Sequence, residues 1–288
     1  MLKSTFEYMP KENEAGRPER NPDDPRWVGW VSRTLIWWAE HMIRTEITGQ
    51  ENLLEAADYV NRNRGGLLVT PNHNSYIDAE ILKRVRDEII AGKKFTALWA
   101  NKFTGEDAGK YSGDGKEDPN KVSIAGKIGR ETARISNIEL INVPQEAKDF
   151  AVARNSITLI ENTGREVLGG NNVLAVFPEG TRSREGTLHK AKKALRVLFR
   201  DKEINTRIMI LPIVATGTGE YLPPDSEKVN PLAKVSIIYG KPYMYSQAVE
   251  ESVKYNLPIE DVLMWHVAQL LPSEKWGEYR DTFSAIGS

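Results

Sequence analysis

His73 is the residue of this sequence whose surroundings best suit proton transfer. It lies in a polar segment directly after a short apolar run, and Asp78 follows it by five positions. Because residues on one helical face lie three or four positions apart, His73 must extend from a loop while Asp78 projects from the first turn of a helix. A carboxylate that accepts the Nδ1 proton fixes the imidazole tautomer and leaves Nε2 free to take a proton. His73 and Asp78 are therefore candidate catalytic residues, a general base and the group that orients it.

The position of Asp78 is also typical of a purely structural role. Ser75-Tyr76-Ile77-Asp78 matches the capping box Ser/Thr-x-x-Asp/Glu, in which the acidic side chain caps the start of a helix. On spacing alone the capping role is the simpler interpretation, and both stay open at this point. A lone histidine in a helical pattern is usually structural, and this applies to the other three histidines, His41, His189 and His266.

A second segment, Phe177-Pro178-Glu179-Gly180-Thr181-Arg182-Ser183, is typical of an anion-binding turn. It follows an apolar run and precedes a helical pattern. Gly180 permits close approach of the backbone to a ligand. Thr181 and Ser183 supply hydroxyl groups, and Arg182 supplies a planar fork that suits phosphate. The segment therefore predicts an oxyanion site.

Composition excludes several other classes of function. The 288 residues include no cysteine, which excludes thiolate nucleophiles, disulfides and thiolate metal sites, and we expect no metal. The net charge of −1 gives no overall positive field that would attract nucleic acid. Residues 182–207 nevertheless contain nine lysines and arginines against three acidic residues, either a solvated helix face or part of a phosphate site. The glycine-rich dinucleotide fingerprint, the P-loop and Gly-x-Ser-x-Gly are absent, so we expect a base that acts on a hydroxyl near a phosphate.

Apolar runs that alternate with helical patterns predict an α/β fold with a mixed, largely parallel sheet flanked by helices. The expected strands cover residues 67–70, 95–100, 138–143, 173–177, 208–215 and 235–239. The expected helices cover residues 50–61, 74–92, 148–162, 189–199 and 260–271. In such sheets ligands bind beyond the carboxyl ends of the strands. The segments of His73 and Arg182 follow the first and fourth of these strands, so we expect both near that edge.

The N-terminal part divides into two segments of different character. Residues 1–26 are rich in charge, proline and asparagine, and we expect them to form a flexible arm. Residues 27–62 are expected to form a helical membrane-interface segment that does not span the bilayer. The apolar face of its first, amphipathic helix comprises Trp27, Trp30, Val31, Leu35, Trp38 and Met42. The tryptophans suit a headgroup layer, but a helix packed on its own domain fits the same pattern.

Taken together, the two motifs resemble those of the glycerolipid acyltransferases. Asn72-His73-x-Ser75-x-x-Asp78 resembles the His-x4-Asp block of that family, and the segment from Phe177 to Ser183 resembles its Glu-Gly-Thr-Arg block. Leu211-Pro212-Ile213 resembles a later block, Val-Pro-Val/Ile. The family also has an arginine after a short apolar run between the first two blocks, and residues 138–144 contain none. The resemblance covers roughly residues 45–245 and points to the reaction type more strongly than to the acceptor.

The resemblance implies transfer of a fatty acyl group from acyl-CoA or acyl carrier protein to a lysophospholipid hydroxyl, most simply that of 1-acylglycerol 3-phosphate. His73 and Asp78 would be catalytic. The acceptor would be bound by Lys102, Glu179, Gly180, Thr181, Arg182 and Ser183, although Glu179 could instead brace its loop. No cofactor beyond the acyl donor is implied, and the protein would act peripherally at anionic lipids on the cytoplasmic face of a membrane. Residues 63–288 would form the acyltransferase domain, with an exposed insertion at about 104–121.

Two alternatives accompany this interpretation. The protein could acylate another acceptor, such as glycerol 3-phosphate, a glycolipid or an aminolipid, or take its acyl group from a phospholipid. It could also be a lipid-binding scaffold that keeps the fold without catalysis. The presence of both His73 and Asp78 disfavours the scaffold, because a protein that only binds lipid has no use for a base and its orienting carboxylate.

Overall fold

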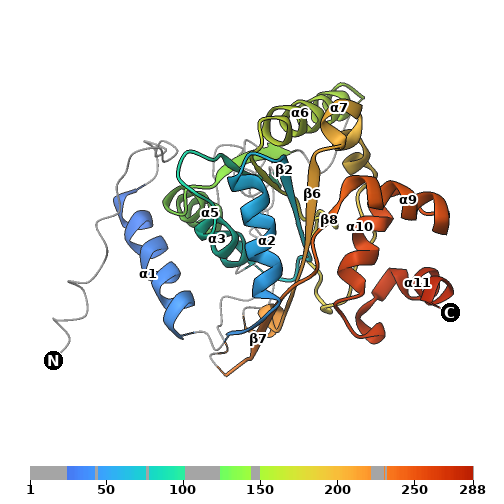
Figure 1. Cartoon of the computed structure of the whole chain (residues 1–288). Helices are drawn as coiled ribbons and strands as arrows, with labels where there is room; N and C mark the ends of the chain where they lie inside the picture. Colours follow the sequence, from blue (N-terminus) through green and yellow to red (C-terminus); the bar gives the residue numbers. More distant parts are fainter. Residues whose placement is uncertain are drawn as a thin grey trace.

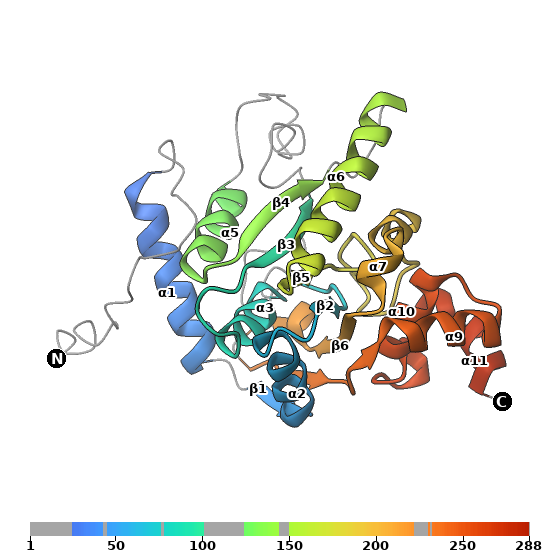
Figure 2. The ribbon, with the colours of Figure 1, turned by 45° about the horizontal axis from the view of Figure 1, so that its top comes forward.

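The computed structural model describes residues 25–42, 45–75, 78–100, 124–143, 150–221, 230 and 232–287. These residues form one mixed sheet of eight strands with helices on both faces (Figure 1, Figure 2). The predicted α/β fold with a largely parallel sheet is therefore confirmed. Residues 1–24, Lys102 and the expected insertion at 104–121 lie outside the described residues.

The strands lie in the order β1-β7-β6-β2-β5-β3-β4, and β8 pairs with β6. Their bounds are β1 Thr45–Thr48, β2 Gly66–Pro71, β3 Phe95–Ala100, β4 Glu139–Val143, β5 Val173–Ala175, β6 Ile208–Thr216, β7 Val235–Tyr239 and β8 Tyr243–Met244. Strands β6, β2, β5, β3 and β4 run parallel to one another, whereas β7 and β8 pair antiparallel with β6. The carboxyl ends of the five parallel strands therefore share one edge of the sheet.

Helices cover both faces of this sheet (Figure 1). On one face lie α2 (Gln50–Asn61), α3 (Asp78–Asp87) and α5 (Ile124–Ile135). On the other lie α6 (Phe150–Gly169), the 3₁₀ helix η1 (Lys193–Phe199), α9 (Tyr245–Tyr255), α10 (Ile259–Ala268) and α11 (Arg280–Gly287). Shorter pieces are α7 (Lys202–Asn205), α8 (Thr218–Tyr221), η2 (Ser273–Lys275) and η3 (Gly277–Tyr279). Because both faces are covered, the central strands are apolar throughout rather than alternating.

Helix α1 (Arg26–Met42) packs beside α5 at the outside of the molecule (Figure 2). Val28, Ser32 and Ile36 are its buried residues, spaced four apart along one face. The Ser32 hydroxyl donates to the Ile128 carbonyl at 3.3 Å. The helix is therefore partly a packed element of the domain, through a face that the sequence pattern did not indicate.

Three tryptophans of α1 whose side chains are described lie on its exposed part. Trp27 and Trp30 are 47% and 60% exposed, and Trp37 is exposed as well. The side chains of Leu35, Trp38 and Met42, which the sequence placed on the apolar face, lie outside the described part. One face of α1 thus packs on α5, and at least two tryptophans are presented to solvent.

The structure differs from the expected elements in two places that matter below. The boundary expected after residue 62 falls inside a single unit, because β1 and α2 precede it and belong to the same sheet and core. The helix expected over 189–199 is wrong in its first part, since helical structure begins only at Lys193 and is of the 3₁₀ type. The segment that precedes η1 follows the turn at residues 177–183, the predicted anion-binding turn, and lies beside it.

Candidate active site

The segments of His73 and Arg182 follow neighbouring strands whose connections leave the sheet on opposite faces. β2 leads to α3 on one face, and β5 leads to η1 on the other. The crevice at such a point is the usual ligand site of open α/β sheets. The two segments are in direct contact, because the Ser183 N–H donates to the His73 carbonyl at 2.7 Å. The structure therefore brings the two motifs together at the expected edge.

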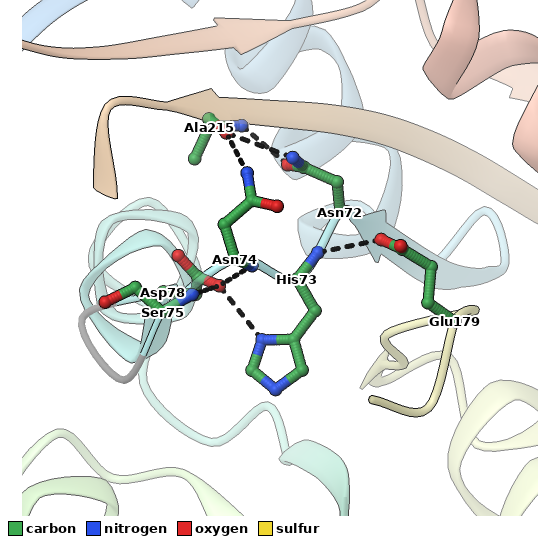
Figure 3. Close-up of polar contacts among 7 residues, drawn as sticks. All are labelled: Asn72, His73, Asn74, Ser75, Asp78, Glu179 and Ala215. Atoms are coloured by element: carbon green, nitrogen blue, oxygen red, sulfur yellow. Dashed lines mark hydrogen bonds and ion pairs between the residues drawn. The ribbon is translucent and has the colours of Figure 1, made fainter. Parts of the chain in front are cut away.

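The hydrogen bond expected between His73 and Asp78 is present (Figure 3). His73 Nδ1 lies 2.9 Å from Asp78 Oδ2, and the same oxygen accepts the backbone N–H groups of Asn74 and Ser75 at 2.7 and 2.8 Å. The bond from the Ser75 N–H is the carboxylate half of a capping box. Asp78 thus has both the orienting and the capping geometry. Because an ionised carboxylate only accepts, this arrangement assigns the ring proton to Nδ1 and leaves Nε2 as an acceptor.

The imidazole ring of His73 is also held by an aromatic contact. The rings of His73 and Phe177 have centroids 4.3 Å apart and planes inclined by 30°. Trp99 in turn meets Phe177 edge-on, with centroids 6.4 Å apart. Nε2 lies on the side of the ring away from Asp78 (Figure 3), and the His73 side chain is 16% exposed. His73 is thus partly exposed, while the carboxylate of the buried Asp78 is shielded from water.

Two asparagines fix the loop that carries His73. The Asn72 side chain donates to the Ala215 carbonyl at 3.0 Å and accepts the Ala215 N–H at 2.7 Å. Asn74 donates to the same carbonyl at 3.0 Å (Figure 3). Both asparagines are buried, and Ala215 lies near the carboxyl end of the adjacent β6. The loop is thus tied to its neighbouring strand on both sides of the base.

Glu179 links the loop that carries His73 to the segment that begins near His189, after the turn. One carboxyl oxygen accepts the His73 N–H at 3.0 Å (Figure 3), and the other accepts the His189 N–H at 2.8 Å. The side chain is buried, and burial raises the pKa of Glu179 to about 8, against a smaller lowering by the two N–H donors. These contacts are those of a brace rather than of a group that binds glycerol.

The buried Glu179 predicts a specific pH dependence of stability. Between its ordinary pKa of 4.5 and about 8, the carboxyl is protonated in the folded protein and ionised in the unfolded chain. The free energy of unfolding therefore falls as pH rises from about 5 to about 8, by at most about 1.4 kcal/mol per pH unit from this group. Urea unfolding of the wild type and Glu179→Gln across this range measures it, because glutamine does not titrate. Parallel pH curves for the two proteins would contradict the assignment.

The remaining residues of the turn have distinct environments. Gly180 has a φ of 62°, in the left-handed region that favours glycine, and its N–H donates to the Phe177 carbonyl at 3.0 Å. Thr181 is exposed and Arg182 is partly exposed. The buried Ser183 hydroxyl instead accepts the N–H of Thr187 at 3.1 Å, which closes the turn on itself. Of the predicted binding residues, Ser183 thus has the contacts of a structural residue.

The C-terminal part of the chain supports the segment beyond the turn. The Tyr279 hydroxyl accepts the Ala191 N–H at 2.8 Å and donates to Asp261 at 2.6 Å. Burial is the largest cause that raises the pKa of Tyr279. The Leu188 N–H donates to the Lys275 carbonyl at 3.0 Å. The position of residues 188–192 is therefore set by η2, η3 and α10.

Sequence reasoning assigned no role to Asn72, Asn74 or Phe177. The two asparagines stand on either side of His73, and this symmetry around the base was the available signal.

In the part of the chain that the structure describes, no three His, Asp or Glu side chains are grouped so as to hold a metal ion. Across the same ranges, no helix has the length and apolar character needed to cross a bilayer.

Comparison with known proteins shows which family this chain resembles. Residues 133–216 match the model of the Acyltransferase family. A 1-acyl-sn-glycerol-3-phosphate acyltransferase of Cocos nucifera is 30% identical over 158 residues, which cover 51% of this chain and 49% of that protein. A chloroplastic 1-acyl-sn-glycerol-3-phosphate acyltransferase of Arabidopsis thaliana is 36% identical over 72 residues, 25% of this chain and 19% of that protein. The chain thus spans half or less of these relatives, and its resemblance to the glycerolipid O-acyltransferases is confirmed.

Proposed function

Because this chain resembles the glycerolipid acyltransferases, we propose that it moves a fatty acyl group from acyl-CoA or acyl carrier protein to the hydroxyl of a lysophospholipid. The observation that carries the proposal is His73, held at Nδ1 by Asp78 with Nε2 facing away from it, beside a turn with an arginine. The most suitable acceptor is 1-acylglycerol 3-phosphate, the substrate in the names of both relatives. The product would then be phosphatidic acid.

The geometry supports a direct transfer in which His73 acts as both base and acid. Nε2 takes the proton of the acceptor hydroxyl as its oxygen attacks the thioester carbonyl carbon. The tetrahedral intermediate then collapses, the carbon–sulfur bond breaks, and Nε2 returns the proton to the departing thiolate. Asp78 stabilises the imidazolium that exists between the two steps. A thiol with a pKa of about 8.5 leaves far more readily than an alkoxide, so no acyl-enzyme is needed.

The anion-binding turn supplies a place for the phosphate of the acceptor. Arg182 offers a planar pair of donors that matches phosphate oxygens. The exposed Thr181 offers a hydroxyl, and the left-handed φ of Gly180 shapes the turn. Contact between the turn and the His73 loop keeps the distance between headgroup and base constant. Binding of the headgroup therefore positions the hydroxyl, and positioning supplies a large part of the rate.

The proposal is tested by incubating the purified protein with radiolabelled acyl-CoA, or with acyl-ACP, and a panel of acceptors. We expect labelled phosphatidic acid from 1-acylglycerol 3-phosphate. A labelled product only from glycerol 3-phosphate, a glycolipid or an aminolipid would assign another acceptor. Transfer from a labelled phospholipid without any thioester would assign transacylation. Lipid binding with no transfer in any combination would contradict an enzymatic function and support a scaffold.

The exposed face of α1 supports a peripheral position on an anionic membrane, which we propose to be its cytoplasmic face. Trp27 and Trp30 combine an apolar ring with a polar N–H, which suits the headgroup layer. Arg26 and Arg33 are also exposed and would meet anionic lipids. A membrane position would bring the crevice to an acceptor and a product that both reside in the bilayer.

Replacing both exposed tryptophans is therefore expected to weaken membrane binding without unfolding the domain. Each ring contributes about a tenfold gain in partitioning when it enters the interface, so Trp27→Ser with Trp30→Ser should lower it about 10- to 100-fold. Sedimentation with vesicles that contain phosphatidylglycerol measures this effect. Val253→Ser removes an exposed apolar side chain from α9 and serves as the matched control. Equal sedimentation of the double variant and the wild type would refute the anchor.

A further inference from the structure

The side chain of Lys192 lies across Gly180 of the anion-binding turn. A Cβ placed on Gly180 would lie 2.8 Å from Lys192 Cγ and 3.0 Å from Lys192 Cε, with Cδ at 3.5 Å. Three successive carbons of the lysine stem thus lie close to Gly180, so the stem passes along this residue of the turn although Lys192 as a whole is exposed. The absence of a side chain at Gly180 is what leaves room for this path.

The backbone holds Lys192 in this position from both sides. Its N–H donates to the carbonyl of Pro178 at 2.9 Å, and its carbonyl accepts the Leu195 N–H at 3.0 Å. Its backbone is extended, with φ −73° and ψ 124°. The preceding residue, Ala191, is fixed by the hydroxyl of Tyr279. Lys192 is therefore attached to the same turn through its main chain and through its side chain.

The surroundings of the Lys192 ammonium group differ from those of several basic side chains near it. Lys190 lies over the ring of Tyr279 at 4.1 Å, Arg196 pairs with Glu260, and Arg200 pairs with Glu161 at 2.9 Å. Among the residues that the structure describes, no carboxylate forms an ion pair with Lys192. The ammonium group is exposed at the end of a stem whose course is set by the turn.

We propose that Lys192 binds the phosphate of the acceptor from the side of Gly180, together with Arg182, and so selects phosphate monoesters. This inference rests on the proposed function and adds a residue and a specificity to it. A monoester phosphate carries close to two negative charges at pH 7, and two cations on one short turn match it better than one. Arginine offers a rigid fork, whereas lysine offers a compact charge that adjusts to the remaining oxygen. A phosphodiester acceptor, with one charge, gains less from the second cation.

The test compares Lys192→Gln, Lys192→Arg and the control Lys193→Gln in steady-state kinetics. Lys193 is the adjacent residue, is exposed and carries the same charge. For 1-acylglycerol 3-phosphate we expect Lys192→Gln to raise KM about 10- to 100-fold, the effect of losing a charge-assisted hydrogen bond. Lys192→Arg should restore most of this loss, and Lys193→Gln should change KM by less than about twofold. The KM for the acyl donor should be unchanged in all three.

A second arm measures specificity and binding apart from chemistry. The ratio of kcat/KM for lysophosphatidate to kcat/KM for lysophosphatidylglycerol, a phosphodiester, should fall in Lys192→Gln and not in Lys193→Gln. Calorimetric titration with glycerol 3-phosphate should show the same loss of affinity, and thermal unfolding verifies that each variant is folded. If the wild type is active and Lys192→Gln has the same KM and the same specificity ratio as the wild type, this inference alone is overturned. A wild type that transfers no acyl group to any acceptor overturns the proposed function and this inference with it.

Discussion

Replacement of His73 by alanine is expected to lower the rate of acyl transfer by about 10²- to 10⁴-fold, the range that a positioned general base contributes. The imidazole is the group whose Nε2 faces away from Asp78, and Asp78 itself is buried with its accepting oxygen occupied by three N–H donors. Single-turnover measurement with labelled acyl-CoA and 1-acylglycerol 3-phosphate separates the chemical step from binding. The KM for the acceptor should change little, because the phosphate contacts lie in the other segment.

A second histidine provides a matched control for this loss. His266 also pairs with a carboxylate, since its Nε2 lies 2.6 Å from Glu251 Oε2, but it lies on α10, away from the crevice. His266→Gln is expected to lower stability and to leave the rate per folded molecule within about twofold. A His73→Ala protein that folds and transfers acyl groups at the wild-type rate would refute the mechanism.

Asp78→Asn is expected to separate the two roles that the structure gives to this residue. Asparagine retains an oxygen that can accept the N–H groups of Asn74 and Ser75, and it caps helices about as well as aspartate. It removes the negative charge that stabilises the imidazolium and sets the tautomer of His73. We therefore expect kcat to fall by about 10²- to 10⁴-fold while the free energy of unfolding changes by less than about 1.5 kcal/mol.

Asp78→Ala completes the comparison because it removes both roles. It should lower stability by about 1–3 kcal/mol in addition to the loss of activity, since two backbone N–H groups lose their buried acceptor. Urea unfolding and initial rates measured on the same preparations distinguish the variants. If Asp78→Asn kept full activity, Asp78 would be only the cap that its spacing also allowed.

The local part of the site was accessible from the sequence. His73 and Asp78 are five positions apart, so their contact depends only on the loop and the first turn of one helix. The turn that contains Gly180 was accessible for the same reason. The contact between the two motifs could be expected only as proximity at one sheet edge, because it depends on strand order. Glu179, whose partner His73 lies 106 positions away, was accordingly predicted both as a ligand and as a brace.

The segment after the turn shows why helix prediction failed there. Residues 189–199 have helical periodicity, but the N–H groups of His189, Ala191 and Lys192 are used by Glu179, Tyr279 and Pro178. These contacts hold the segment against other parts of the fold, and the backbone of Lys192 is extended, with φ −73° and ψ 124°, so helical structure starts only at Lys193. Strand β1 was missed for a different reason. Three of its four residues are polar, most are exposed, and the strand lies at one edge of the sheet.

The hydrogen bonds of Asn72 and Asn74 to Ala215 affect the stage of folding at which the site forms. They join positions 143 and 141 residues apart, so the loop around His73 gains its shape only after β6 has entered the sheet. A growing chain that has reached residue 200 already carries both motifs but lacks the strand that aligns the imidazole. In partially folded molecules the imidazole is therefore not yet positioned, and the candidate site is complete only once β6 has joined the sheet.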